Sequence, residues 1–271
     1  MQIYVINLTR ATERRQVMEQ QAQTLGMTFN YLAATDGHSL TDADRGMVDH
    51  ERRKRITPYP LTDNEIGCWL SHRRAMQQLL DSRQRMAAIV EDDAVLSSDF
   101  PKVLEAIENL GEPFDVIDLH TTFTKTDLFL PCRPLIPGCH LGRSGGSTHS
   151  NTAYVISCAG AQKFLKYASR FVHAVDKELH RYWANGLDIY CLQKPVAVPD
   201  DHGYSYIDET RWHDRPKGRL RYPDANGLYW QLQRRWTKIC DSVQKRKAFA
   251  AYVRSDQTTM TKAVHVEGNV S

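Results

Sequence analysis

The 271-residue sequence contains no run of about 18 unbroken apolar residues, so no segment is predicted to cross a membrane. Its six cysteines are scattered and none stands in a CxxC pair, which argues against a zinc knuckle and against a small disulfide scaffold. The start, MQIYVINL, offers neither a basic beginning nor a signal-type apolar segment with a small-residue cleavage site. We therefore expect reduced thiols and a cytoplasmic protein.

Charge is unevenly distributed. The formal net charge is +3, yet residues 211–254 hold 12 Lys and Arg against three Asp and no Glu. This segment carries +9, which leaves about −6 on the rest of the chain. The split predicts an acidic or neutral catalytic body, residues 1–203, followed by a basic, helical C-terminal extension, residues 204–271. Solvation of a surface helix is the simpler explanation of the basic segment, and contact with an anionic surface is the alternative that we favour.

The pattern of apolar residues predicts an α/β fold with a mostly parallel central sheet flanked by helices. A buried strand over residues 3–8 is followed by a polar helix that Gly26 closes, and then by the extended run FNYLAA. Thr62 and Glu65 form a capping box for a helix that continues to Asp81. Strands MAAIV, FDVIDL and AYVIS follow, and helices are expected over residues 101–110, 160–169 and 177–185. The stretch from Thr121 to Ser150, rich in Pro, Gly, Ser and Thr, is predicted to be a long loop.

Three consecutive carboxylates, Glu91, Asp92 and Asp93, follow the strand MAAIV directly. Ligands in open α/β sheets bind outside the carboxyl ends of the strands, which is where these acids are expected. Mg²⁺ or Mn²⁺, held by one or two carboxylates and the oxygens of a diphosphate, would offset their mutual repulsion. A solvated acidic turn is the alternative explanation.

Further polar residues follow the first two predicted strands. Asn7, Arg10 and Arg14 come after the first strand, and guanidinium groups at a helix start suit phosphate and ribose oxygens. Asp36 follows the second strand and could accept a hydrogen bond from a ribose or base. Solvated helix arginines and an ordinary turn aspartate are the alternatives.

Four other residues are candidates for the same crevice. Ser71 and His72 lie within the helix over residues 62–81, where a histidine on an apolar face is usually a core residue. Asp118 ends the FDVIDL strand. Asp176 is positioned to be the N-cap of the next helix, whatever else it does.

Taken together, these segments resemble glycosyltransferase family 25, which includes bacterial lipo-oligosaccharide galactosyltransferases and relatives that glycosylate collagen. The similarity covers roughly residues 1–200, in the order found in the family. It lies in IYVINLTRATERR, ATDG, EIGCWLSHRRAM, AAIVEDDAVL, FDVIDL, NTAYVIS, AGAQKFL and AVDKEL.

The resemblance implies a GT-A-type nucleotide-binding domain, a UDP-sugar donor, a divalent cation (Mn²⁺ or Mg²⁺) and transfer of a hexose, galactose favoured, with inversion. The acceptor it implies is a saccharide of lipopolysaccharide or lipo-oligosaccharide. The basic C-terminal segment predicts peripheral attachment to the inner face of the cytoplasmic membrane, where a lipid-linked acceptor would lie. Glu91 and Asp93 match the acidic motif that meets the donor ribose and the metal. By the same resemblance, Asn7, Arg10, Arg14 and Asp36 look like nucleotide contacts, and Ser71 and His72 match a helix motif near the donor.

Inversion also requires a base for the acceptor hydroxyl, and a well-placed carboxylate contributes about 10²- to 10⁴-fold in rate. Asp176 is our first candidate, with Asp92 and Asp118 as rivals. Two other functions remain open. A metal-dependent phosphohydrolase could also use acids at a strand end with nearby arginines. A nucleic-acid binder would act through the basic segment, but no nucleic-acid motif is present, so nucleic acid is not the expected partner.

Overall fold

The computed structural model describes residues 1–121, 128–145, 151–200 and 221–267, with side chains up to residue 254. An eight-stranded sheet occupies its centre, in the order β2-β1-β3-β8-β5-β9-β7-β6. A small antiparallel pair, β4 with β10, lies beside it. The strands are β1 (Gln2–Asn7), β2 (Asn30–Ala33), β3 (Met86–Glu91), β4 (Ala94–Leu96), β5 (Val116–Asp118), β6 (Phe129–Ile136), β7 (Cys139–Ser144), β8 (Ala153–Ser157), β9 (Ile189–Leu192) and β10 (Ala197–Pro199).

Most strands of the large sheet run in one direction. β1 pairs in parallel with β2 and β3, and β5 pairs in parallel with β9. β8 is antiparallel to β3 and β5, and β7 is antiparallel to β9 and β6. Only β7 and β8 of this eight-stranded sheet therefore oppose the other strands. The predicted α/β fold with a mostly parallel sheet flanked by helices is confirmed.

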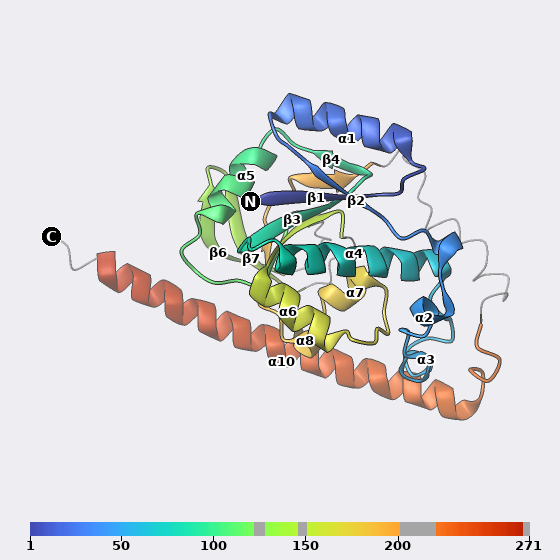
Figure 1. Cartoon of the computed structure of the whole chain (residues 1–271). Helices are drawn as coiled ribbons and strands as arrows, with labels where there is room; N and C mark the ends of the chain where they lie inside the picture. The colour runs from blue at the N-terminus through green and yellow to red at the C-terminus, as the bar shows by residue number, and fades with distance from the viewer. Residues whose placement is uncertain (122–127, 146–150, 201–220, 268–271) are drawn as a thin grey trace.

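Helices cover both faces of the sheet (Figure 1). α1 (Thr12–Leu25) and α5 (Phe100–Glu108) pack on one face, whereas α4 (Asp63–Asp81) and α6 (Cys158–Tyr167) pack on the other. The shorter helices are η1 (Gly37–Ser39), α2 (Asp42–Arg45), α3 (His50–Lys54), α7 (Val175–Leu179) and α8 (Tyr182–Asn185). The long helix α10 (Leu228–Glu267) runs along the molecule beside α8.

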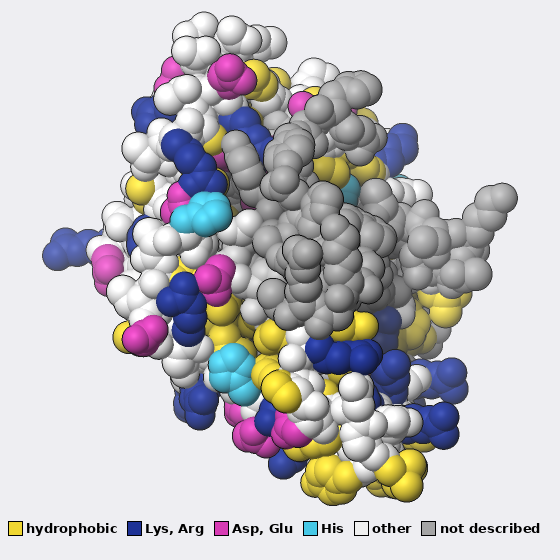
Figure 2. Space-filling model, turned by 90° about the vertical axis from the view of Figure 1, so that its right-hand side faces the viewer, with side chains coloured by type: hydrophobic (Ala, Val, Ile, Leu, Met, Phe, Trp, Pro, Cys, Tyr) yellow, Lys and Arg dark blue, Asp and Glu magenta, His cyan; other side chains and the backbone are white. Residues whose placement is uncertain are grey.

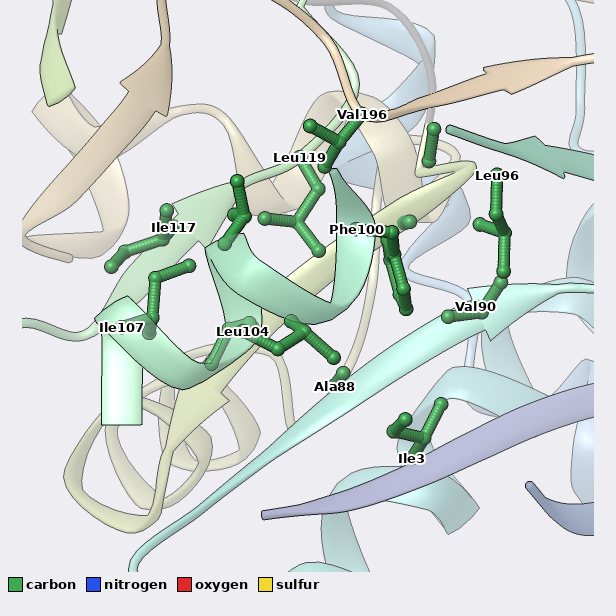
Figure 3. Close-up of a cluster of buried hydrophobic side chains, with 14 of the residues drawn as sticks. Ile3, Ala88, Val90, Leu96, Phe100, Leu104, Ile107, Ile117, Leu119 and Val196 are labelled. Carbon is green, nitrogen blue, oxygen red and sulfur yellow. The ribbon is translucent and has the colours of Figure 1, made fainter. Parts of the chain in front are cut away.

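Strand alternation divides the apolar residues into two cores. Ile3 and Val5 of β1 face the core under α1 and α5, whereas Tyr4 and Ile6 face the core under α4. Phe100 of α5 is fully buried in the first core, the cluster of apolar side chains drawn in Figure 3. Full burial of one such side chain stabilises the fold by about 1.5–3 kcal/mol.

Helix α4 is fixed at its start by the predicted capping box. The Thr62 hydroxyl accepts from the Glu65 amide at 3.1 Å, and the Glu65 carboxylate accepts from the Thr62 amide at 2.8 Å. One turn further on, Gly67 lets the helix approach the turn after β2: a Cβ there would lie 2.5 Å from the Thr35 carbonyl oxygen. The sequence of α4 thus determines how closely the helix lies against the ends of β1 and β2.

The predicted loop from Thr121 to Ser150 is wrong over its described part, because β6 and β7 form a hairpin there. Proline removes a backbone donor, but β6 is the outermost strand of the sheet and tolerates this loss. Its register with β7 shifts beside Pro131 and Pro134. Gly138, with φ of +77°, provides the tight turn. Residues 122–127 and 146–150 of the predicted loop are not among the residues that the structure describes.

The prediction of one helix over residues 177–185, with Asp176 as its N-cap, is also wrong. The first helix, α7, has Ala174 at its N-cap position, so Asp176 lies inside the first turn. A second short helix, α8, follows and ends at Gly186 in the left-handed conformation. The break falls at His180, whose Nδ1 donates to the Asp176 carbonyl at 2.7 Å.

The C-terminal segment is helical over α10, as predicted. The Arg181 guanidinium donates to Asp241 of α10 at 2.7 Å, and the Tyr252 hydroxyl donates to the Leu187 carbonyl at 2.8 Å. In the described part of the chain, no helix combines the length and apolar character needed to cross a membrane. A domain boundary at residue 203 falls in an undescribed stretch and stays a prediction.

Candidate active site

A pocket lies where the carboxyl ends of β1, β2 and β3 come together. Parallel pairing aligns Asn7 with Ala33 and Ile6 with Glu91, so residues that follow these strands meet at one edge of the sheet. We call this cavity the α4 pocket, because α4 forms one wall. Eight of the predicted site residues line it: Arg10, Arg14, Asp36, Ser71, His72, Glu91, Asp92 and Asp93.

The three consecutive carboxylates turn toward different partners. Glu91 continues the alternation of β3 and faces α4, where its Oε1 lies 3.2 Å from His72 Nε2. The Cys68 thiol lies 4.0 Å from the same oxygen. Strand alternation therefore turns Glu91 away from Asp92, whereas Asp93, two residues on, still feels the charge of Glu91.

Asp92 is held by two residues from the start of the chain. The Asn7 amide donates to its Oδ2 at 2.7 Å, and the Arg14 guanidinium donates to its Oδ1 at 3.0 Å. Asn7 itself is buried and also donates to the Ala11 carbonyl. Asn7 thus acts on the pocket by orienting Asp92.

The negative charge of Asp93 is the least neutralised of the three by nearby cations and hydrogen-bond donors. Arg14 donates to it at 3.4 Å, a longer contact than the one to Asp92. Burial, reinforced by the charges of Glu91 and Asp92 and only partly opposed by Arg14, raises the pKa of Asp93 to about 7. A carboxylate that resists ionisation for these reasons suits a divalent cation, since oxygen donors are the preferred ligands of Mg²⁺ and Mn²⁺.

Arg10, Asp36 and Ser71 also line the pocket, as predicted. Arg10 pairs with Asp36, and Asp36 also accepts from the His38 amide at 3.0 Å. Ser71 is buried: its hydroxyl accepts from the Thr35 amide at 2.8 Å and donates to the Gly67 carbonyl at 2.7 Å. Ser71 therefore joins α4 to the turn after β2.

A second cavity adjoins the first at the start of α1. We call it the α1 pocket; it includes Glu13, Val95 and Asp200. The two cavities share a wall made of Arg10, Arg14, Asp92 and Asp93. A group bound in one cavity would thus lie beside a group bound in the other.

Asp118 and Asp176 do not line either cavity. Asp118 is buried at 1% exposure, and its Oδ2 lies 3.2 Å from His180 Nε2 beside a third, smaller cavity that also contains Arg143. Burial opposes charging His180, but the hydrogen bond and charge of Asp118, helped by Asp176, outweigh it and raise the pKa of the imidazole. Asp176 Oδ1 is buried with no hydrogen-bond partner among the described residues.

Three residues of the α4 pocket region were absent from the predicted site. Cys68 lies one helical turn before His72, so the helix period that placed His72 also places Cys68. Asn64 lines the pocket near the start of α4. The Tyr154 hydroxyl lies 3.0 Å from His72 Nδ1, a contact that pairing of β8 with β3 creates and that spacing along the chain does not reveal.

The sequence model of the family described as "Glycosyltransferase family 25 (LPS biosynthesis protein)" matches residues 1–179 of the 271. The chain belongs to glycosyltransferase family 25. The resemblance inferred from the segments around the pocket is therefore confirmed, and the matched region contains every residue named above as lining the α4 or α1 pocket, except Asp200.

Three individual relatives are 25% to 29% identical to this chain where they align. A glycosyltransferase 25 family member of Anopheles gambiae is 29% identical over 177 residues, covering 60% of this chain and 28% of that protein. Human procollagen galactosyltransferase 2 is 25% identical, covering 60% and 27%. The probable inactive glycosyltransferase 25 family member 3 of Bos taurus is 25% identical, covering 83% and 40%. The alignments thus span less than half of these relatives.

Among solved structures, the inositol-1-phosphate CTP transferase from T. maritima aligns with a TM-score of 0.34 and 10% identity, over 73% of this chain and 67% of that one.

Proposed function

We propose that this member of glycosyltransferase family 25 transfers a hexose, with galactose favoured, from a UDP-sugar to a saccharide acceptor with inversion at the anomeric carbon. The observation that carries the proposal is the α4 pocket, which gathers two arginines and four carboxylates at the carboxyl ends of three parallel strands. The procollagen galactosyltransferases among the relatives support galactose. The description of the family as an LPS biosynthesis protein supports a lipopolysaccharide or lipo-oligosaccharide acceptor.

The roles follow from the charge that develops as the sugar leaves. Arg10 and Arg14 supply guanidinium groups toward the diphosphate, which becomes more negative in the transition state. Asp36, beside Arg10, would accept from the ribose or base. Asp93 would hold a divalent cation, Mn²⁺ or Mg²⁺, together with diphosphate oxygens. When bound, such a cation supplies Lewis-acid stabilisation of the leaving group.

Glu91 and Asp93 were both predicted to bind the divalent cation, and we now propose Asp93 alone as its protein ligand. Glu91 engages His72 and Cys68 instead of facing the same partner as Asp93. We propose that Ser71 and His72 position other groups of the site. Ser71 joins α4 to the turn after β2, and His72 orients Glu91.

For the base we propose Asp92 ahead of Asp176 and Asp118, which reverses the order expected from sequence. Asp92 lies in the wall that the two cavities share, so an acceptor in the α1 pocket would reach it. Asn7 and Arg14 hold its carboxylate in one orientation. Asp118 is already paired with His180.

The donor is tested by thermal unfolding with UDP-galactose, UDP-glucose and UDP-N-acetylglucosamine, each with and without Mn²⁺. We expect the largest stabilisation from UDP-galactose with Mn²⁺. The Asp93→Asn variant should lose the part of this thermal stabilisation that depends on Mn²⁺. The Asp99→Asn variant should keep it, since Asp99 is an exposed aspartate six residues further on. Hydrolysis of simple phosphate esters without any response to UDP-sugars would favour a phosphohydrolase and overturn the proposal.

The base is tested by measuring UDP release with a saccharide acceptor. Asp92→Asn should lower kcat by about 10²- to 10⁴-fold. Asp176→Asn and Asp118→Asn, compared at a temperature where each is folded, should lower it far less. A near-normal kcat for Asp92→Asn would remove that assignment and leave the donor proposal intact.

We also propose that α10 docks on an anionic membrane surface, where a lipid-linked acceptor would lie. Four apolar residues spaced 4, 3 and 4 apart form one stripe along the helix: Leu232, Trp236, Ile239 and Val243. They are 45% to 66% exposed. Asp241 and Tyr252 hold the opposite side of the helix against the body. Figure 2 shows hydrophobic side chains, with basic ones beside them, at the lower edge of the molecule where α10 begins.

The charge around this apolar stripe favours an anionic membrane, and not a second copy of the chain, as the surface that covers it. Exposed cations accompany it at Arg235, Lys238, Arg246 and Lys247. Asp241 is the single acid among the described side chains of α10, and it is paired with Arg181. Two such basic faces would repel each other. Anionic lipid would instead attract the helix, with a free energy of about 1 kcal/mol for each basic residue near the surface. The same surface chemistry is the basis for a peripheral location at the inner face of the cytoplasmic membrane.

Flotation with vesicles of phosphatidylcholine and phosphatidylglycerol tests this docking. We expect binding that high salt releases and that pure phosphatidylcholine vesicles do not support. The double variant Trp236→Gln, Ile239→Gln should lose most binding, while Val17→Gln, an equally exposed apolar residue on α1, should not. Dimerisation in light scattering without flotation would identify a second copy as the occupant and refute membrane docking.

A further inference from the structure

Cys68, His72 and Glu91 form a cluster of three different metal-ligating side chains in the wall of the α4 pocket. Cys68 and His72 lie one turn apart on α4 and therefore on the same face of the helix. Glu91 reaches them from the end of β3. One ligand atom of each lies within 4.8 Å of the others.

The separations in this cluster are near those of a tetrahedral site. Zinc bonds of about 2.0–2.1 Å to nitrogen and 2.0–2.2 Å to oxygen place the two ligand atoms about 3.4 Å apart at a tetrahedral angle. His72 Nε2 and Glu91 Oε1 are 3.2 Å apart. A zinc–sulfur bond of about 2.3 Å similarly requires about 3.6 Å between sulfur and oxygen, and Cys68 Sγ lies 4.0 Å from Glu91 Oε1. These two separations are within a few tenths of an ångström of the tetrahedral values, and the third, between Cys68 Sγ and His72 Nε2, lies within 4.8 Å.

The surroundings of His72 prepare it to act as a ligand. Its Nδ1 lies 3.0 Å from the Tyr154 hydroxyl, and the two rings stack with centroids 5.8 Å apart. Without an ion, Nε2 donates to the Glu91 carboxylate. With an ion bound, the proton would sit on Nδ1 and be donated to the Tyr154 oxygen, and the Nε2 lone pair would be left for the ion. This is the arrangement in which metal-binding histidines are usually oriented by a neighbouring group.

We propose that Cys68, His72 and Glu91 bind a thiophilic divalent ion of the zinc class, with the fourth ligand position open to the α4 pocket. This site differs from the cation site at Asp93 in its donors, because a thiolate and an imidazole favour zinc over magnesium or manganese. A bound ion would bridge α4 to β3 and fix Glu91. The inference concerns metal binding alone and stands apart from the transfer reaction.

Cobalt(II) is the probe, because a tetrahedral site with a thiolate ligand gives intense visible bands and a thiolate-to-cobalt charge-transfer band. The full chain is titrated with Co²⁺, and Zn²⁺ is then added to displace it. We expect both bands to appear with one equivalent and to vanish with zinc. A wild-type protein that gives only the weak spectrum of octahedral cobalt overturns the proposal.

Matched variants assign the ligands. Cys68→Ser should abolish the charge-transfer band, while Cys158→Ser, a thiol bonded to the Gln84 carbonyl outside the pocket, should keep it. Glu91→Gln differs in one atom and should weaken cobalt affinity at least tenfold. Tyr154→Phe should weaken it by about 10- to 100-fold.

Asp93→Asn separates this site from the hard-cation site and from the proposed function. The variant should leave the cobalt spectrum unchanged even though it is expected to lose the manganese response. A charge-transfer band that survives in folded Cys68→Ser, or that disappears in Asp93→Asn, would show that the ion lies elsewhere and refute the assignment.

Discussion

Neutralising Asp93 is expected to stabilise the protein at neutral and alkaline pH. Its pKa is about 7 in the fold against an ordinary value of 3.8. Between these values the unfolded chain has released the proton while the folded chain retains it, so the stability of the wild type falls as pH rises from about 4 to 7. Asp93→Asn removes this loss, because the amide carries no charge at any pH.

The magnitude follows from the same shift. A difference of this size in pKa corresponds to about 4 kcal/mol, at 1.36 kcal/mol for each tenfold change in ionisation. The side chain remains 27% exposed, and solvent screening reduces the effect. We therefore expect Asp93→Asn to exceed the wild type by about 2 kcal/mol at pH 8 and to equal it near pH 4.

Urea unfolding at several pH values, without divalent cations, measures this difference. Asp92→Asn is the matched control: Asp92 accepts from Asn7 and Arg14, so its loss should not stabilise at any pH. Mn²⁺ with UDP should narrow the gap at pH 8 by stabilising only the wild type. An Asp93→Asn variant that is less stable than the wild type at pH 8 would show that Asp93 is not crowded by its neighbours, and the electrostatic argument would fail.

Two further predictions concern the framework of the site. His180 has a raised pKa, so its pairing with Asp118 contributes stability that is fully present below its ordinary value of 6.5 and is lost as pH rises through the folded value. His180→Gln should therefore cost about 1–3 kcal/mol at pH 6 and clearly less at pH 9 in urea unfolding; an equal cost at both would contradict the ion pair. Gly67→Ala should cost about 1–3 kcal/mol, because its Cβ would lie 2.5 Å from the Thr35 carbonyl oxygen, whereas Gly111→Ala, with no atom within 4 Å, should be neutral in the same assay. Equal stabilities for these two variants would mean that α4 does not approach the turn so closely.

Local signals in the sequence predicted the elements that form the pocket. The apolar run of β1, the capping box of α4 and the run MAAIV before the acids each reflect interactions within a few residues. The β6–β7 hairpin was missed because prolines normally argue against a strand, and only its place at the sheet edge makes them acceptable. The start of α7 was misplaced because Asp176 is a favourable N-cap residue, yet its helix begins one residue before it.

Most residues that line the pocket could be predicted from the sequence, but the contacts between their side chains could not. Parallel strands place their carboxyl ends together, so the order of strands and polar residues indicated that the acids and arginines would meet. Asp118 and Asp176 were predicted to face the same crevice, yet neither lines this pocket. For Asp118 the reason is that β8 lies between β3 and β5 in the sheet. That insertion moves Asp118 to another cavity, beside His180.

Residue order and local periodicity were enough to predict the α/β character, the position of the acids after β3 and the family to which the chain belongs. They did not predict that Glu91 faces Cys68 and His72 while Asp92 and Asp93 face Arg14. These contacts join groups from distant segments, as with Asn7 and Asp92, which are 85 residues apart along the chain. Which partner reaches which acid depends on how the helices pack against the sheet.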